Sequence, residues 1–349
     1  MGKNKPSKKP FVSICTPTFN RRPFIPYIIK CFDNQTYPKD KMEWIIIDDG
    51  TDKIEDLVKD HPCVKYYKYD EKMTLGKKRN LSNEKSKGDI IIYMDDDDYY
   101  PKERVSHAVD TLLKNPKALC AGSSIMHIYF KHIHKMYQFG PYGPNHATAA
   151  TFAFRKELLN KTKFEETSCV AAEKKFLKDY TVPFVQLDSN KTILVFSHIQ
   201  NSFDKKELLK QMPNPFISET LKVPSDFVKE DDILKFFMED IDNLLSEYKP
   251  GSIENKQDVI KALSDIKENR ENMLKDEIKK QQDYQNLISK MEVLNPQLAQ
   301  FKINDLTNVI NSLNIENSQL KEKVKYLEDK LKNIVMEKIQ ERKHTVINI

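Results

Sequence analysis

The chain has 349 residues, with 57 Lys and Arg against 52 Asp and Glu, and therefore a formal net charge of +5 at pH 7. This length suggests two or three domains, and so small an excess of positive charge does not favour a nucleic-acid-binding protein. With only 8 glycines and 31% charged residues, the composition excludes a collagen-like repeat and favours long charged helices. No apolar run reaches the roughly 18 residues that a membrane span needs, so none is expected.

Two features of the sequence bear on its location. The five cysteines are scattered, without a Cys-x-x-Cys pair, as is typical of thiols in a reducing compartment. Residues 1–10 are basic and lack the apolar stretch of a secretory signal. We therefore expect a basic disordered arm at residues 1–10 and a cytoplasmic protein.

Residues 11–210 alternate short apolar runs with amphipathic stretches, which predicts an α/β domain with a mixed, mostly parallel sheet flanked by helices. Strands are expected at residues 11–16, 44–47, 64–69, 90–94 and 118–123. Helices are expected at residues 24–32, 76–86 and 103–113. In such sheets ligands bind beyond the carboxyl ends of the strands.

The remainder of the chain has a different texture. Residues 211–252 are expected to form a proline-bearing linker and an amphipathic helix, and residues 253–349 a helical region interrupted at Pro296. Within it, one set of apolar residues recurs at every seventh position, namely Leu306, Leu313, Leu320, Leu327 and Ile334. A second set with the same spacing alternates with the first and contains one asparagine, namely Ile310, Asn317, Val324 and Leu331. This pattern predicts a parallel, dimeric coiled coil at about residues 303–338. The alternative is an amphipathic helix that folds back on the first domain.

Four consecutive aspartates, residues 95–98, directly follow the most apolar expected strand. Acidic runs are usually solvated surface segments. At the end of a buried strand, however, such a run is suited to a hard divalent cation such as Mg²⁺ or Mn²⁺. Because alternate side chains of an extended segment share a face, Asp95 and Asp97 are expected to point into one cleft.

Two other expected strands also end in polar residues. The second leads into Asp49 and Gly50, which alone would suggest an ordinary Asp-Gly turn. The first leads into Phe19, Arg21 and Arg22, side chains suited to a base, a ribose and phosphates. Three polar strand ends on one edge of a sheet indicate a single ligand site.

Taken together, these segments resemble family 2 glycosyltransferases of the GT-A fold. The resemblance extends over roughly residues 11–209 and is carried by residues 12–21, 45–50, 79–80, 88–89, 95–98 and 101. It implies a Rossmann-like GT-A fold in which a nucleoside-diphosphate sugar lies over the strand ends. It also implies that Pro17, Phe19 and Asp49 flank the nucleotide. Lys77, Lys78 or Arg79 would lie near the base or the phosphates.

The acidic run stands where this family carries its D-x-D motif. By resemblance, Asp95 and Asp96 would contact the nucleotide, and Asp97, with Asp95, would hold the metal. Four aspartates in a row leave Asp96 or Asp98 open as the metal ligand instead. His198, after the apolar residues 193–196, would by the same resemblance be a further metal ligand, the alternative being a structural histidine.

Glu173 stands where the family carries an acidic motif on the acceptor side, and it is the candidate catalytic base. Ala172 replaces the second acidic residue of that motif, and a glutamate that begins a helix is also a favourable partner of the helix dipole.

These residues fit a metal-dependent inverting glycosyltransferase that uses Mn²⁺ or Mg²⁺. A nucleoside-diphosphate sugar, with a UDP-sugar favoured, would donate its sugar to a hydroxyl of a glycan, lipid or protein acceptor. One alternative is a non-catalytic dimeric coiled-coil scaffold on a relic GT-A domain. Another is a sugar nucleotidylyltransferase, whose glycine-rich phosphate loop this sequence lacks after Thr16. Residues 173–208 also resemble glycosyltransferases of large DNA viruses, which implies the host cytoplasm or the virion.

Overall fold

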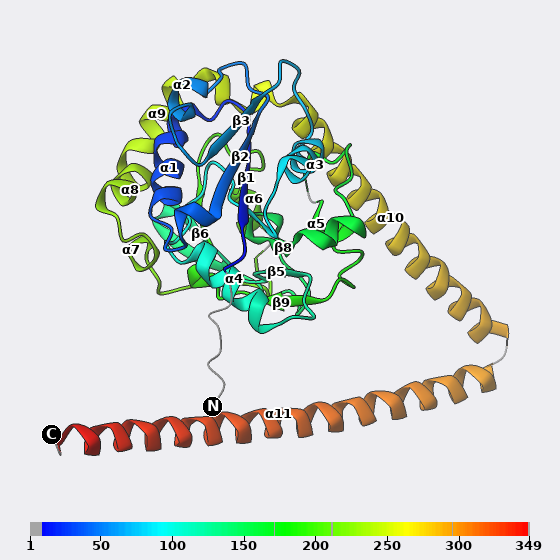
Figure 1. Cartoon of the computed structure of the whole chain (residues 1–349). Coiled ribbons are helices and arrows are strands. Elements are labelled where there is room, and N and C mark those ends of the chain that lie inside the picture. The colour runs from blue at the N-terminus through cyan, green and yellow to red at the C-terminus, as the bar shows by residue number, and fades with distance from the viewer. Residues whose placement is uncertain (1–8, 171, 211, 295, 348–349) are drawn as a thin grey trace. The chain divides into compact units, whose positions relative to one another are not determined.

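The structure, a computed structural model, describes residues 9–170, 172–210, 212–294 and 296–347 (Figure 1). Side chains are described outside residues 291–299, 326–329 and 331–347. The chain divides into two compact units, Met1–Lys267 and Glu268–Ile349. Most of the expected basic arm, residues 1–8, lies outside the described part of the chain.

A seven-stranded sheet lies at the centre of the first unit, in the order β3-β2-β1-β4-β8-β5-β9. Strands β1 to β4 run parallel, whereas β8 runs antiparallel to both of its neighbours, β4 and β5. The strands are β1 Val12–Thr18, β2 Met42–Asp48, β3 Val64–Lys68, β4 Ile90–Tyr93, β5 Cys120–Gly122, β8 Ala153–Arg155 and β9 Phe184–Gln186. The mixed, mostly parallel α/β sheet expected from the sequence is therefore confirmed.

A second sheet of four strands has the order β10-β6-β7-β11. Its strands are β6 Met126–Phe130, β7 Lys135–Phe139, β10 Leu194–Ser197 and β11 Ile217–Glu219. Tyr99, which directly follows the acidic run, pairs with Leu194 of β10. This pairing places the segment after β10, with His198, beside the acidic run.

The helices complete the first unit and form all the regular structure of the second. They are α1 Ile25–Asp33, α2 Glu55–Val58, α3 Leu75–Lys85, α4 Arg104–Lys114, α5 Glu173–Phe176, α6 Lys206–Leu209, α7 Pro224–Phe227, α8 Asp231–Lys235, α9 Ile241–Glu247, α10 Gln257–Leu294 and α11 Pro296–Ile347. The core carries aromatic stacks such as Phe32 on Trp44, whose ring centroids are 4.8 Å apart. Trp44 also donates its Nε1–H to Thr16 Oγ1 at 2.8 Å, which satisfies the buried indole.

Helix α3 buries polar residues instead of an apolar face, namely Gly76, Lys78, Arg79, Asn80, Ser82 and Asn83. Its N-terminal end packs closely, because a Cβ on Gly76 would lie 2.0 Å from the carbonyl oxygen of Glu165. Thr74 caps the helix by accepting a hydrogen bond from the backbone N–H of Lys77 at 3.2 Å. The helix thus brings cationic side chains to the carboxyl ends of β1 and β4.

Residues 211–252, expected to form a linker and an amphipathic helix, contain the helices α8 and α9 and pack onto the first unit. Strand β11 pairs with β7, and Phe237 stacks on Phe196 with ring centroids 4.1 Å apart. Tyr27 of α1 stacks on Phe236 at 3.6 Å. These buried aromatic contacts make the segment part of the folded unit.

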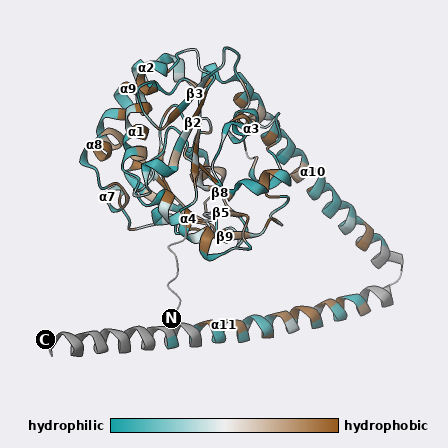
Figure 2. Cartoon of the chain, viewed as in Figure 1, coloured by the Kyte–Doolittle hydropathy of each residue, from teal (hydrophilic) through white to brown (hydrophobic). Residues whose placement is uncertain are grey.

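Helices α10 and α11 form the expected helical tail, and Pro296 stands at the first position of α11, where its missing N–H has no helical partner. Figure 2 shows α10 as largely hydrophilic. In α11 the heptad residues with described side chains are about half exposed: Leu306, Ile310, Leu313, Leu320 and Val324. The side chains of Leu327, Leu331 and Ile334 lie outside the description, and the coiled coil stays a prediction. Within the described residues, no helix combines the length and the apolar character that crossing a bilayer would require.

Candidate active site

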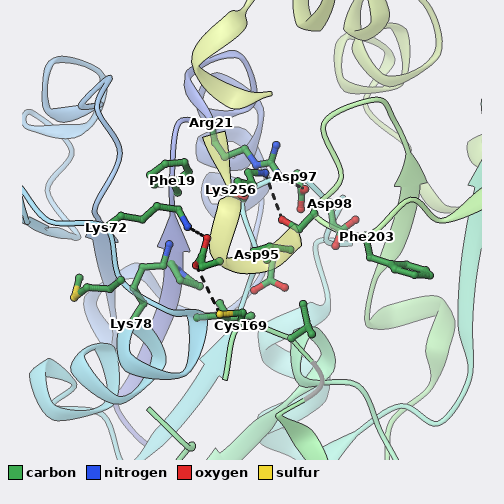
Figure 3. A pocket seen from close by; sticks show the side chains of 18 of the residues that line it. Phe19, Arg21, Lys72, Lys78, Asp95, Asp97, Asp98, Cys169, Phe203 and Lys256 are labelled. Atoms are coloured by element: carbon green, nitrogen blue, oxygen red, sulfur yellow. Dashed lines mark hydrogen bonds and ion pairs between the residues drawn. The ribbon is translucent and has the colours of Figure 1, made fainter. Parts of the chain in front are cut away.

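A pocket of about 240 Å³ lies at the carboxyl ends of β1 and β4 (Figure 3). Several segments that are distant in the sequence line it: Pro17, Phe19 and Arg21; Lys72, Met73, Leu75 and Lys78; the aspartates 95–98; Cys169 and Val170; Ser202, Phe203 and Lys205; and Lys256, Asp258 and Val259. The pocket therefore contains the whole acidic run together with residues of the turn after β1, as expected from adjacent parallel strands.

Arg21 forms the main ion pairs of the acidic run. Its Nη2 lies 3.0 Å from Asp97 Oδ2 and its Nε lies 3.6 Å from Asp96 Oδ1. It also donates to the backbone oxygen of Gln200 at 2.9 Å. His198 Nε2 approaches Asp97 Oδ2 from another side, at 3.4 Å, so Asp97 lies between a guanidinium and an imidazole.

Burial and mutual repulsion separate the acidities of the aspartates. Burial raises the pKa of Asp95, and it raises that of Asp96 to about 7, with the charge of Asp97 adding to the rise. Burial and the Asp97 charge also hold the pKa of Asp98 well above its ordinary value. Burial alone would raise the pKa of Asp97 as well, but Arg21 and His198 outweigh it and lower that pKa well below its usual range. Asp97 is therefore the most acidic carboxyl group of the run.

The chemistry of these side chains fits a divalent cation. Asp95 Oδ1 and Asp98 Oδ1 are buried oxygens that have no hydrogen-bond partner among the described residues. Carboxylate oxygens are the ligands that Mg²⁺ and Mn²⁺ prefer. Burial lowers the pKa of His198 to about 4, which keeps its imidazole neutral. Among the described residues, however, no group of three acidic, histidine or cysteine side chains is already arranged to hold a metal ion. Arg21 occupies the space beside Asp96 and Asp97.

Arg79 contacts the acidic run from outside the pocket, because it pairs with Asp95 and does not line the pocket. Its Nη2 lies 3.6 Å from Asp95 Oδ1, and its guanidinium packs between the rings of Tyr93 and Phe164, at 5.2 and 5.4 Å from their centroids. The sequence analysis expected Arg79 near the base or phosphates. In this arrangement Arg79 positions Asp95 instead.

Arg104, at the start of α4, is fully buried beneath the same strand end. Its Nη2 donates to the backbone oxygens of Tyr93, Thr151 and Phe152, at 3.3, 2.8 and 2.9 Å. It therefore connects the end of β4 with the turn that precedes β8.

Asp49 also lies behind the pocket wall, where it holds other residues in place. Its Oδ1 accepts a hydrogen bond from Lys78 Nζ at 2.8 Å, and its Oδ2 accepts one from the backbone N–H of Met73 at 2.5 Å. Lys78 and Phe19 line the pocket, and the Lys72 and Lys78 ammonium groups lie 5.0 and 5.7 Å from the centre of the Phe19 ring. The structure thus places Pro17, Phe19 and Lys78 on the pocket wall and Asp49 behind them.

Glu173, the candidate base, begins the short helix α5 and is partly buried. Its Oε1 accepts a hydrogen bond from the backbone N–H of Ala149 at 3.2 Å. Its charge is one of the smaller influences that raise the pKa of Asp95, so the two carboxylates lie close enough to interact electrostatically. Glu173 lies beside the pocket and not in its lining.

Sequence reasoning missed the site residues that come after β10 in the chain. Lys205 and Lys256 line the pocket, and Gln200 joins their two segments, because it accepts from Arg21 and Lys256 through its backbone oxygen. These residues stand in irregular segments without a motif, so only the position of His198 gave a signal for this region.

The first unit is similar in sequence to known glycosyltransferases. Residues 13–181 match the sequence profile of the family described as "Glycosyl transferase family 2". The poly(ribitol-phosphate) beta-N-acetylglucosaminyltransferase TarS of Staphylococcus aureus is 28% identical over 109 residues, which are 28% of this chain and 18% of TarS. The putative teichuronic acid biosynthesis glycosyltransferase TuaG of Bacillus subtilis is 27% identical over 129 residues, 34% of this chain and 48% of TuaG. The matched segments thus span less than half the length of these relatives.

Two solved structures align with part of this chain. A crystal structure of S. aureus TarS 1–349 in complex with UDP-GlcNAc aligns with 53% of this chain and 58% of that one, at 19% identity and a TM-score of 0.44. The mannosyltransferase PcManGT of Pyrobaculum calidifontis, in complex with GDP-Man and Mn²⁺, aligns with 67% of this chain and 73% of that one, at 15% identity and a TM-score of 0.45.

Proposed function

Because residues 13–181 carry a family 2 glycosyltransferase domain, we propose that the chain is a metal-dependent inverting glycosyltransferase. It takes a sugar from a nucleoside-diphosphate sugar and transfers it to an acceptor hydroxyl. A UDP-sugar is the favoured donor, and UDP-N-acetylglucosamine is the first to test, because TarS is named as an N-acetylglucosaminyltransferase.

One observation carries this proposal: the acidic run, Phe19 and five cationic side chains line the same pocket at the carboxyl ends of β1 and β4. The cations are Arg21, Lys72, Lys78, Lys205 and Lys256. A nucleoside diphosphate offers an aromatic base and two phosphates, which such a mixture of aromatic and cationic side chains can bind. The combination does not fit an ordinary solvated acidic surface, because Asp96 and Asp98 are buried.

Asp97, Asp95 and His198 would hold the divalent cation, which when bound offsets negative charge on the diphosphate leaving group. Arg21 already pairs with Asp97 at 3.0 Å, and its planar guanidinium is suited to phosphate oxygens as well. Arg79 and Arg104 keep the end of β4 in place from the buried side. The protein thus offers positive charge where the leaving group needs it.

Glu173 would remove the proton from the acceptor hydroxyl as its oxygen attacks the anomeric carbon from the face opposite the leaving group, which gives inversion. Its Oε1 is oriented by the Ala149 N–H, while Oε2 has no hydrogen bond among the described contacts. A carboxylate fixed through one oxygen leaves the other available for a proton.

Transfer assays with a panel of UDP- and GDP-sugars, with Mn²⁺ and with EDTA, test the function. Glu173→Gln keeps an oxygen acceptor for the Ala149 N–H, so the variant is expected to bind donor while its turnover falls roughly 10²- to 10⁴-fold. Glu157→Gln, at an exposed position, is the matched control. Wild-type turnover in Glu173→Gln would remove that residue from the base role. Absence of both nucleotide binding and turnover in the wild-type protein would favour the relic scaffold.

We also propose that α11 forms a parallel homodimeric coiled coil through its heptad residues. Leu306, Leu313 and Leu320 are 59%, 54% and 53% exposed, and leucines at one heptad position with an asparagine at the other favour two parallel strands. Such a tail would pair two catalytic units without contributing to the chemistry.

A further inference from the structure

We propose that Lys256 binds the diphosphate of the donor, so that the segment leading into α10 completes the active site. The inference rests on the proposed function, because it assumes a nucleoside-diphosphate donor. It assigns a site residue well beyond residue 181, where the match to the glycosyltransferase family ends.

Lys256 is a buried cation that reaches the pocket. Only 4% of the residue is exposed, and Figure 3 shows Lys256 among the residues that line the pocket, near Arg21 and the acidic run. Its Nζ donates to the backbone oxygen of Gln200 at 3.2 Å and to Ser202 Oγ at 3.3 Å. An ammonium group has three donors, so one N–H remains for a ligand.

Three of the four aspartates in the acidic run are paired with other cations. Asp96 and Asp97 pair with Arg21, and Asp95 with Arg79. Among the described residues, no carboxylate oxygen lies within 4.0 Å of Lys256 Nζ, so Lys256 forms no ion pair with them. A buried ammonium group without a counter-ion is costly, and burial accordingly lowers the pKa of Lys256 to about 7. An anion in the pocket would supply the missing partner.

The segment that carries Lys256 is fixed in place before any ligand arrives. Gln200 Nε2 donates to the backbone oxygens of Leu245 and Tyr248, at 2.9 and 2.7 Å, and Asn20 Nδ2 donates to that of Pro250 at 3.0 Å. Gly251 packs so closely that a Cβ would lie 2.0 Å from Gln200 Oε1. A cation held by such contacts loses little entropy when it binds a ligand.

A diphosphate is the anion that fits best. Arg21 and Lys205 line the same pocket, so cations from three distant segments converge there with Lys256. Phe19, which follows β1, also lines the pocket, and its aromatic ring could stack on the base of the nucleotide. A lysine that only satisfied the oxygens of Gln200 and Ser202 would stabilise the fold and would not discriminate between ligands.

The experiment compares the affinities of UDP and uridine by calorimetry, in Mn²⁺ and in EDTA, with GDP and guanosine in parallel. Lys256→Gln is expected to weaken UDP binding by roughly 10- to 100-fold, as expected for the loss of one hydrogen bond to a charged group, while uridine affinity stays unchanged. Lys256→Arg is expected to restore much of the UDP affinity. Lys249→Met, an exposed lysine of the same segment, is the matched control.

The ratio of the two affinities is the deciding quantity, because a general folding defect weakens both ligands together. An unchanged ratio in Lys256→Gln, with UDP bound by the wild-type protein, would overturn the role of Lys256 and leave the proposed function intact. Failure of the wild-type protein to bind any of the four ligands would overturn both proposals. If Lys256→Gln does not fold, Lys256→Met gives the same ratio.

Discussion

Replacing Asp96 by asparagine tests the electrostatic description of the acidic run. Asp96 is 7% exposed, and burial together with the charge of Asp97 raises its pKa from 3.8 to about 7. Between those values the folded protein keeps a proton that the unfolded chain has lost. The contribution of Asp96 to stability is therefore full below about pH 4, and it falls as the pH rises toward 7.

Asparagine is neutral at every pH, so Asp96→Asn escapes this loss. One pKa unit corresponds to about 1.4 kcal/mol, and the free energy of unfolding of the variant should therefore gain about 2 kcal/mol on the wild type between about pH 5 and pH 7. Above about pH 8 the difference should be level, because both states of the wild type are then ionised. Arg21, Asp95, Asp97, Asp98 and Lys256 are the charged or titratable side chains that act on this carboxylate, and all five are present in both proteins.

Urea denaturation in EDTA, followed by fluorescence, measures the effect. The chain has one tryptophan, Trp44, which is 1% exposed and reports directly on the first unit. Asp60→Asn removes an exposed carboxylate and serves as the control. A difference between Asp96→Asn and wild type that stays constant, or shrinks, from about pH 5 to pH 7 would refute the argument.

Three further predictions concern packing and the boundaries of the two units. Gly76→Ala should lower the free energy of unfolding by about 1–3 kcal/mol, because its Cβ would meet the Glu165 carbonyl oxygen; an unchanged urea midpoint would contradict this. A chain that ends after Lys267 should fold and bind nucleotide, since it contains the whole first unit, whereas one that ends after Ser252 should lose nucleotide binding in calorimetry; equal affinities would contradict the role of this segment. Leu313→Glu should convert a dimer to a monomer in sedimentation equilibrium without changing nucleotide affinity, and a persistent dimer would contradict the coiled coil.

The core strands could be predicted because their apolar runs are long and end in clear turn signals. The first expected strand, residues 11–16, corresponds to β1 at Val12–Thr18. Strand β8 could not be predicted, because its three residues show no periodicity and its antiparallel place beside β4 depends on tertiary pairing. The packing of Phe236 and Phe237 likewise depends on partners distant in the sequence, so residues 211–252 read as a linker.

The site was predictable where neighbouring parallel strands end and unpredictable elsewhere. Lys78 and Arg79 are adjacent on one helix and therefore leave it in directions about 100° apart, and the sequence alone does not show which of them faces the pocket. The structure turns Lys78 into it and Arg79 beneath Asp95. Lys256 lines the pocket because the segment before α10 packs against Gln200. No local sequence pattern predicts this long-range contact.

The three hydrogen bonds of Arg104 have a consequence for the spacing of the two substrates. One guanidinium nitrogen joins Tyr93, which stands two residues before Asp95, to the turn at Thr151. The same turn supplies the Ala149 N–H that holds Glu173. Arg104 therefore connects the strand that leads into Asp95 with the turn that holds Glu173. In the proposed mechanism it would fix the distance between the leaving group and the acceptor hydroxyl without contacting either, and a shorter side chain at this position would change that distance.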